Sequence, residues 1–116
     1  MVTMRVSDLA GRRSRNLEAL VDTGASHTVF PRDMLEELGV EPRRKEPFQL
    51  ADDRTVEYDV GDALIRLNGK EGIAPVVFGE PRGPVLLGAT TLEIFNLGVD
   101  PIRKRLIPIR GLLMRF

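Results

Sequence analysis

The segment of residues 20–26, Leu-Val-Asp-Thr-Gly-Ala-Ser, constrains this chain more than any other. It places one carboxylate, Asp22, at the end of an apolar stretch and just before a glycine suited to a tight turn. An ionised carboxylate in apolar surroundings is costly unless it is hydrogen-bonded or its pKa shifts. If a twofold axis brought Asp22 against its own copy, the two groups would share one proton. The segment therefore predicts a strand and a turn that carries half of an acid–base pair.

Composition limits the size of the fold and the chemistry available to it. A chain of 116 residues with 42% hydrophobic content buries one core, which predicts a single domain over residues 1–116. The chain has no cysteine and a single histidine, His27, so the usual zinc ligands are missing. We expect no metal and no other cofactor.

Charge and hydropathy restrict the partners. The 17 basic and 17 acidic residues cancel, so no net charge favours nucleic acid or an acidic membrane surface. The N-terminal residues lack an apolar stretch of signal-peptide length, and nowhere do about 18 apolar residues follow one another. We therefore expect a cytoplasmic protein with no nucleic-acid or membrane partner.

Short strands dominate the expected fold, because 11 glycines and 8 prolines are scattered through the whole chain. Apolar and polar residues alternate over residues 56–60, and apolar residues recur at alternate positions over 63–67, so both segments predict half-buried strands. Asn68 and Gly69 favour a type I′ turn, which would lead into a strand over residues 73–78.

Two short helices are expected between the strands. The first is predicted over residues 31–38, with Gly39 as its left-handed stop. The second is predicted over residues 91–97, because Thr90 and Glu93 match a capping box. A glycine follows this second segment as well.

The two predicted helices end in similar sequences. Residues 38–42 read Leu-Gly-Val-Glu-Pro and residues 97–101 read Leu-Gly-Val-Asp-Pro, and a Gly-Ala pair precedes each helix at 24–25 and 88–89. This predicts an internal repeat of strand, glycine turn, helix and exit, in which only the first copy holds the acid. A chance match is the alternative, since glycine commonly ends helices.

Two motifs together resemble the single-domain, retropepsin-like branch of the aspartic proteases. They are Asp-Thr-Gly-Ala at residues 22–25, followed by Thr28 and Val29, and Val-Leu-Leu-Gly at residues 85–88 before a predicted helix. The resemblance covers about residues 17–106. It implies an all-β fold: a closed acid-protease-like β-barrel with two short helices and an internal pseudo-twofold repeat.

The resemblance also implies a function, a homodimeric aspartic endopeptidase with its active site at the twofold axis. Asp22 and its copy would activate a water molecule for attack on a peptide or protein substrate, and Thr23 and Gly24 would support them by hydrogen bonds. The positions implied to bind substrate are Ala25, Ser26, His27, Ala51, Asp52, Asp53, Leu86 and Leu87.

A second predicted hairpin lies where the family carries its flap. Residues 48–51 and 54–56 flank Asp52 and Asp53, which favour a tight turn. Residues 46–58 contain no glycine, unlike the glycine-rich retroviral flaps, so a solvated turn without a ligand is the competing interpretation. If the hairpin closes on substrate, its acidic pair would disfavour acidic residues near the scissile bond.

Ser26 and His27 depart from the retroviral pattern, which has acidic residues there and an arginine at the position of Ala89. Both sides of that ion pair are absent, so a different contact is expected to brace this loop. We interpret His27 as a pocket-wall or structural residue rather than a catalytic one.

Three further segments bear on possible partners. The basic segments 12–15 and 43–45 lack interleaved aromatic residues, which favours solvated arginines on loops or strand edges over a nucleic-acid site. Residues 106–116 are too apolar to be left in water, and they are expected either at the dimer interface or against their own subunit's core.

Other functions are consistent with the same residues. A non-catalytic module could keep the retropepsin fold for dimerisation or peptide binding. A monomeric hydrolase could pair Asp22 with another acid such as Asp100. Asp22 could also be only a turn-capping residue, and the chain could process itself from a longer precursor.

Overall fold

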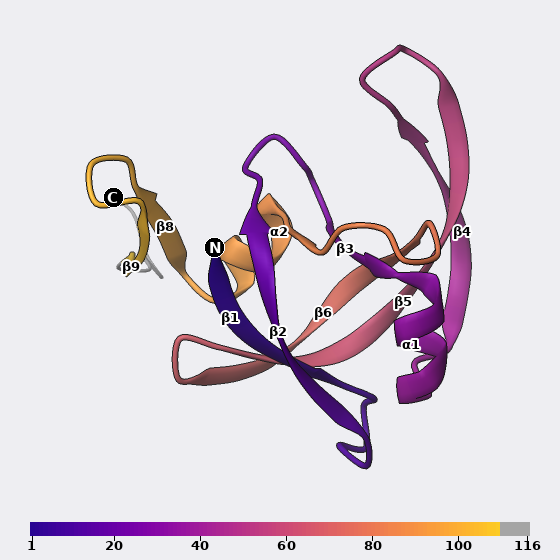
Figure 1. Ribbon diagram of the computed structural model, residues 1–116, viewed down its shortest axis with the longest axis horizontal. Coiled ribbons are helices and arrows are strands. Elements are labelled where there is room, and N and C mark those ends of the chain that lie inside the picture. The colour runs from indigo at the N-terminus through magenta and orange to yellow at the C-terminus, as the bar shows by residue number, and fades with distance from the viewer. Residues whose placement is uncertain (110–116) are drawn as a thin grey trace, which may run out of the picture.

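The computed structural model describes residues 1–109, which form nine strands and two short helices (Figure 1). The helices are α1 (Arg32–Leu38) and α2 (Ala89–Ile94). The strands are β1 (Val2–Ser7), β2 (Ser14–Val21), β3 (Thr28–Pro31), β4 (Pro42–Gln49), β5 (Thr55–Leu67), β6 (Lys70–Gly79), β7 (Leu86–Leu87), β8 (Leu97–Asp100) and β9 (Arg105–Pro108).

Six strands close into a barrel. They run in the order β1-β2-β7-β3-β6-β5, and β5 returns to β1 through antiparallel pairs such as Val6 with Ile65. Strand β4 lies outside this ring and pairs with β5, and the β4–β5 hairpin projects beyond the barrel (Figure 1). The predicted closed β-barrel with two short helices is confirmed.

Alternating residues of the ring fill the core. Val6, Ile65, Phe30 and Phe78 are almost completely buried, and they come from four different strands. Helix α1 contributes the buried side chains Met34, Leu35 and Leu38. The segments predicted as separate strands over residues 56–60 and 63–67 form one continuous strand, β5. Asn68 and Gly69 both have positive φ, 54° and 78°, as a type I′ turn requires.

Helix α1 agrees with its prediction, and Gly39 ends it in the left-handed conformation at φ 79°. The prediction for α2 was wrong at both ends and in its cap, because the helix spans Ala89–Ile94 rather than residues 91–97. The helix begins at Ala89 and has no side-chain cap, so the predicted capping box does not form. The carbonyl oxygens of Ala25 and Ser26 accept the first helical N–H groups instead, and this tertiary contact replaces the cap.

A pseudo-twofold repeat relates the two halves of the barrel. Exchanging β1, β2 and β3 with β5, β6 and β7 preserves every pairing type in the ring, and the Leu20–Leu86 pair maps onto the Val77–Val29 pair. The copies match differently from the expected register, however. Residues 88–89 open α2 and so correspond to the start of α1 rather than to residues 24–25.

This exchange places Gly79 at the position equivalent to Asp22, because Leu20 corresponds to Val77. The similar helix exits also differ in conformation, since Gly39 is left-handed whereas Gly98 lies inside strand β8. The second half of the barrel therefore offers no acid at the equivalent site.

Strands β8 and β9 form a separate two-stranded sheet, at the end of the molecule away from the β4–β5 hairpin (Figure 1). Ile102 and Ile109 in this region are 88% and 53% exposed. The prediction for residues 106–116 falls partly outside the described residues, which end at 109. Neither helix in the described part of the chain has the length and apolar character needed to cross a bilayer.

Candidate active site

Asp22 stands where β2 ends, and its backbone is fixed on both sides. Its N–H donates to the carbonyl oxygen of Leu87 at 2.9 Å, and its own carbonyl oxygen accepts from the N–H of Ala25 at 3.1 Å. The N–H of Gly24 donates to Asp22 Oδ1 at 3.0 Å. The carboxylate is half-buried, while Thr23 and Gly24 beside it are exposed. The turn thus holds one carboxylate oxygen and leaves the group open to a partner.

Backbone hydrogen bonds connect helix α2 to this turn. The N–H of Ala89 donates to the carbonyl oxygen of Ala25 at 2.8 Å, and that of Thr90 donates to Ser26 at 3.0 Å. These are the contacts that brace the loop in place of the ion pair expected from retroviral sequences. They use backbone atoms only, so the side chains at these positions gave no sign of them.

A buried hydroxyl pair joins β3 to α2 beneath the turn. Thr28 and Thr91 are both fully buried, and their hydroxyl oxygens lie 2.5 Å apart. The N–H of Gly88 donates to Thr28 Oγ1 at 3.1 Å. A Cβ at Gly88 would come within 2.4 Å of the His27 carbonyl oxygen, so only glycine fits this junction. The sequence marked Thr28 as part of the motif but not as a structural link.

A groove of about 360 Å³ opens beside the turn. The turn after Asp22, the β4–β5 hairpin and the chain around β6 and β7 all contribute to it. It is lined by Gly24, Ala25, Ser26, His27, Val29, Phe48, Gln49, Leu50, Tyr58, Val77, Glu80, Pro84 and Leu86. Asp22 lies next to this lining rather than in it. Among residues 1–109, no group of three or more acidic or histidine side chains converges to hold a metal.

The residues predicted to bind substrate fall into two groups. Ala25, Ser26, His27 and Leu86 line the groove. Leu87 belongs to this first group too, but its side chain is fully buried behind the groove and its carbonyl oxygen accepts the Asp22 N–H. The structure does not bring the second group, Ala51, Asp52 and Asp53, to the groove; these residues form the exposed tip of the β4–β5 hairpin.

His27 forms part of the groove wall. Its Nδ1 lies 2.9 Å from the Ser26 hydroxyl oxygen, and its ring meets the edge of Phe48 with centroids 5.2 Å apart. Phe48 belongs to β4, so this aromatic contact joins the turn that follows Asp22 to the projecting hairpin.

Comparison with known proteins decides the family. The sequence profile of the family described as aspartyl protease matches residues 2–91, most of the chain. This chain belongs to the aspartyl protease family. The solution structure of the simian foamy virus (mac) protease has a similar fold, with a TM-score of 0.54 and 20% identity. That match covers 78% of this chain and 91% of the viral one. No curated protein matches the chain.

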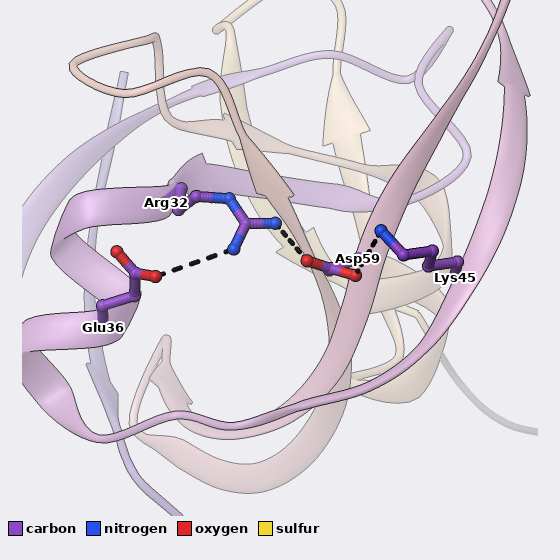
Figure 2. A network of polar contacts seen from close by, with 4 residues as sticks. All are labelled: Arg32, Glu36, Lys45 and Asp59. Carbon is purple, nitrogen blue, oxygen red and sulfur yellow. Dashed lines mark hydrogen bonds and ion pairs between the residues drawn. The ribbon is translucent and has the colours of Figure 1, made fainter.

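The hairpin of this aspartyl protease is attached to α1 by an ion-pair network (Figure 2). Asp59 on β5 pairs with Arg32 of α1 and with Lys45 of β4, the latter at 3.4 Å. The hydrogen bond from Arg32, reinforced by both positive charges, lowers the pKa of Asp59 despite its partial burial. Glu36 adds a longer contact to Arg32 at 3.7 Å. The network fixes the stem of the hairpin and leaves its tip outside.

The sequence did not predict several of the groove residues of this aspartyl protease. Phe48, Tyr58, Glu80 and Pro84 come from three separate chain segments, and no motif links them. The Tyr58 hydroxyl donates to Glu80 Oε1 at 3.3 Å. Burial, together with the nearby negative charge of Glu80, raises the pKa of the Tyr58 phenol. A weak signal existed in the alternation of residues 56–60, which placed Tyr58 on the inward face of its strand.

Proposed function

We propose that two copies of this chain form an aspartic endopeptidase, with the Asp22 carboxylates of both copies at the twofold axis. The observation that carries the proposal is the Asp22 turn. Its carboxylate is hydrogen-bonded through one oxygen to the Gly24 N–H and is otherwise open. The pseudo-symmetric position within the same chain is Gly79, which has no acid to offer. A second copy would supply the missing carboxylate.

Two carboxylates that meet within hydrogen-bond reach at a twofold axis share one proton, so one is ionised while the other is protonated. The ionised Asp22 accepts a proton from a water molecule whose oxygen attacks the peptide carbonyl carbon. The protonated Asp22 of the partner copy donates its proton to the carbonyl oxygen. The carbon–nitrogen bond then breaks as the first Asp22 passes its proton to the leaving nitrogen, and the Asp22 of the partner copy takes back a proton from a hydroxyl group as the new carboxyl group forms. The groove beside the turn would hold the substrate chain.

The Asp22→Asn variant tests this chemistry. An amide cannot accept the water proton, so we expect peptide cleavage to fall by about 10²-fold to 10⁴-fold. The melting temperature should stay within a few degrees, because asparagine can still accept the Gly24 hydrogen bond. Asp100→Asn is the matched control, since the Asp100 carboxylate accepts backbone N–H groups in the β8–β9 turn. Cleavage that survives Asp22→Asn would refute the proposal.

The alternative function is peptide binding without catalysis, and one observation supports it. The groove is lined by thirteen residues that do not include Asp22, so it could bind a peptide whether or not that carboxylate reacts. The two functions are separated by measuring peptide binding and peptide cleavage on the same samples. Binding that is unchanged in Asp22→Asn, with no cleavage by either protein, would favour the module.

A further inference from the structure

Glu80 is the acidic residue of the groove. Of the residues that line the groove, Glu80 is the only carboxylate, and none is lysine or arginine. Within residues 1–109, Glu80 makes no ion pair, whereas Asp59, Asp62 and Asp52 each do. The groove therefore presents an unneutralised carboxylate to whatever enters it.

The position of Glu80 is fixed at its base and by one neighbour. It directly follows β6, whose last residue, Gly79, is buried against β3. The hydroxyl of Tyr58 donates to Oε1, which leaves Oε2 available to a ligand. The raised pKa of Tyr58 keeps its phenol protonated at neutral pH, so it remains a donor to this carboxylate.

Two arginines are close to Glu80 in the sequence or close to its neighbour Tyr58, and neither makes an ion pair with Glu80 in the described residues. Arg54 lies close enough to Tyr58 to influence its titration, but its Nε donates to Asp52 at 2.6 Å. The positive charge of Arg82 acts on Asp33, whose carboxylate also accepts the Arg82 backbone N–H at 3.0 Å. Neither arginine is paired with Glu80.

The remaining lining suits an aliphatic chain. Val29, Pro84 and Leu86 offer partly exposed apolar surface in the same groove as Glu80. Lysine and arginine side chains bury their methylene stems on apolar surface while the charged head reaches a polar partner. An apolar groove with a carboxylate therefore matches the shape and charge of a basic side chain.

We propose that Glu80 selects substrates with a lysine or arginine in this groove, an inference that rests on the proposed peptidase function. Stem carbons pack against Pro84 and Leu86, and the cationic head pairs with Glu80. This assigns charge selection to a different residue from the acidic pair in the hairpin tip. Asp52 is already bonded to Arg54, so its charge is largely neutralised.

The experiment uses matched peptides that differ at one position, which carries arginine, its uncharged aliphatic counterpart norleucine, or glutamate. The position is moved in turn along both sides of the cleaved bond. Cleavage rates give the ratio of kcat/KM for arginine over norleucine in each protein. The proteins are the wild type, Glu80→Gln, Glu80→Lys and the control Glu57→Gln, which removes an exposed carboxylate of β5 outside the groove.

At one position, we expect the wild type and Glu57→Gln to favour arginine over norleucine by about fivefold, typical of a partly exposed ion pair. Glu80→Gln should bring this ratio to about one, and Glu80→Lys should favour glutamate. An arginine preference that persists in Glu80→Gln, or its absence at every position in the wild type, would overturn the assignment. Cleavage itself would still support the peptidase function.

If no peptide is cleaved, the peptidase proposal fails, and the selection of a basic side chain by Glu80 is then tested by measuring peptide binding. Fluorescent versions of the three peptides are titrated with each protein, and the ratio of dissociation constants replaces the ratio of kcat/KM. The same arginine preference, lost in Glu80→Gln, would support Glu80 as the selecting residue of a peptide-binding groove. Equal binding of the three peptides would overturn it.

Discussion

At the scale of single residues, the geometry of Asp22 depends on a neighbour that has no side chain. Gly24 donates its N–H to Asp22 Oδ1 at 3.0 Å, and a Cβ at Gly24 would lie 3.2 Å from the same oxygen. Gly24 does not have a positive φ, so its backbone conformation is open to any residue. A side chain at this position would therefore crowd the carboxylate and push it aside by a few tenths of an ångström.

Gly24→Ala tests this crowding. The added methyl group should displace the Asp22 carboxylate by a few tenths of an ångström, and we expect cleavage to fall by about tenfold. Stability should fall by less than about 1 kcal/mol, since only the carboxylate has to move. Gly72→Ala is the control, because its Cβ would meet the Phe95 ring at an ordinary 3.4 Å. Equal kcat values for the two variants would contradict the spacing argument.

The sequence predicted Asp22 and its turn because a strand end, a carboxylate and a glycine are adjacent in the chain. It did not predict Tyr58 or Glu80 as groove residues, since their contact depends on how β5, β6 and the loop before β7 come together. The acidic pair Asp52 and Asp53 was predicted to touch substrate through its place in a hairpin, yet the hairpin carries both residues to an exposed tip.

At the scale of elements, the network around Asp59 joins three of them. Arg32 comes from α1, Lys45 from β4 and Asp59 from β5, and Figure 2 shows the carboxylate between the two basic side chains. The Arg32 guanidinium also lies 5.2 Å from the centre of the Phe78 ring, in the barrel core. The hairpin stem is thereby tied to the helix and to the core.

Asp59→Asn should destabilise the protein at neutral pH, with a smaller effect in acid. The ion pairs hold the folded pKa of Asp59 below its ordinary value of 3.8. The carboxylate therefore stabilises the fold above that value, and this contribution is lost as the pH falls through the lowered pKa. Melting temperatures of the wild type and Asp59→Asn should converge as the pH drops below about 3.8.

The control for this experiment is Asp62→Asn, which removes a more exposed β5 carboxylate that pairs with Arg43 at 3.6 Å. We expect a smaller loss at neutral pH, because the ion pair of Asp62 is with Arg43 rather than with α1 and is more open to solvent. A difference between the wild type and Asp59→Asn that stays constant from pH 7 to pH 2 would rule out this role for the Asp59 charge.

The contact between β3 and α2 makes a second prediction at this scale. Thr28→Val keeps the side-chain shape but leaves the Gly88 N–H and the Thr91 hydroxyl without a buried partner. We expect a loss of about 1–3 kcal/mol in the free energy of unfolding, measured by denaturant titration. Thr28→Val and Thr91→Val together should cost less than the sum of the single changes. Thr55→Val, at an exposed site, is the control.

Additive losses in the double variant would show that the two hydroxyl groups act independently. A different contact, between α2 and the turn that follows Asp22, explains the error in predicting where α2 begins. Capping rules use side chains within a few residues, whereas the first N–H groups of α2 are satisfied by carbonyl oxygens of the turn at residues 25–26. Helix α1 ends at Gly39 in the left-handed conformation, a signal carried by the local sequence, so the end of this helix was predicted well.

At the scale of the whole molecule, the barrel repeats its architecture but not its chemistry. The exchange of halves maps Asp22 onto Gly79, so each chain brings one carboxylate to the proposed site. Cleavage should then depend on the concentration of pairs rather than of chains. In dilute solution, the cleavage rate per chain should rise as the protein concentration is increased. It should level off at the concentration where sedimentation shows that all chains are dimeric.

Mixing adds a stricter test of the paired site. An excess of Asp22→Asn chains should reduce the activity of a fixed amount of wild type, because mixed dimers hold only one working carboxylate. Asp100→Asn chains are the control and should not inhibit. A rate per chain that stays constant on dilution, unaffected by excess Asp22→Asn, would argue for a site within one chain.

The closed ring leaves β4 as an open edge of the seven-stranded sheet, and this edge has its own chemistry. Its sequence, Pro-Arg-Arg-Lys-Glu-Pro-Phe-Gln, places two prolines and three basic residues along the outer strand. Proline cannot extend a hydrogen-bond ladder, and charged residues discourage another strand from docking. Strand β4 is therefore protected against pairing edge to edge with further strands, so the proposed dimer would not extend into fibres through this edge.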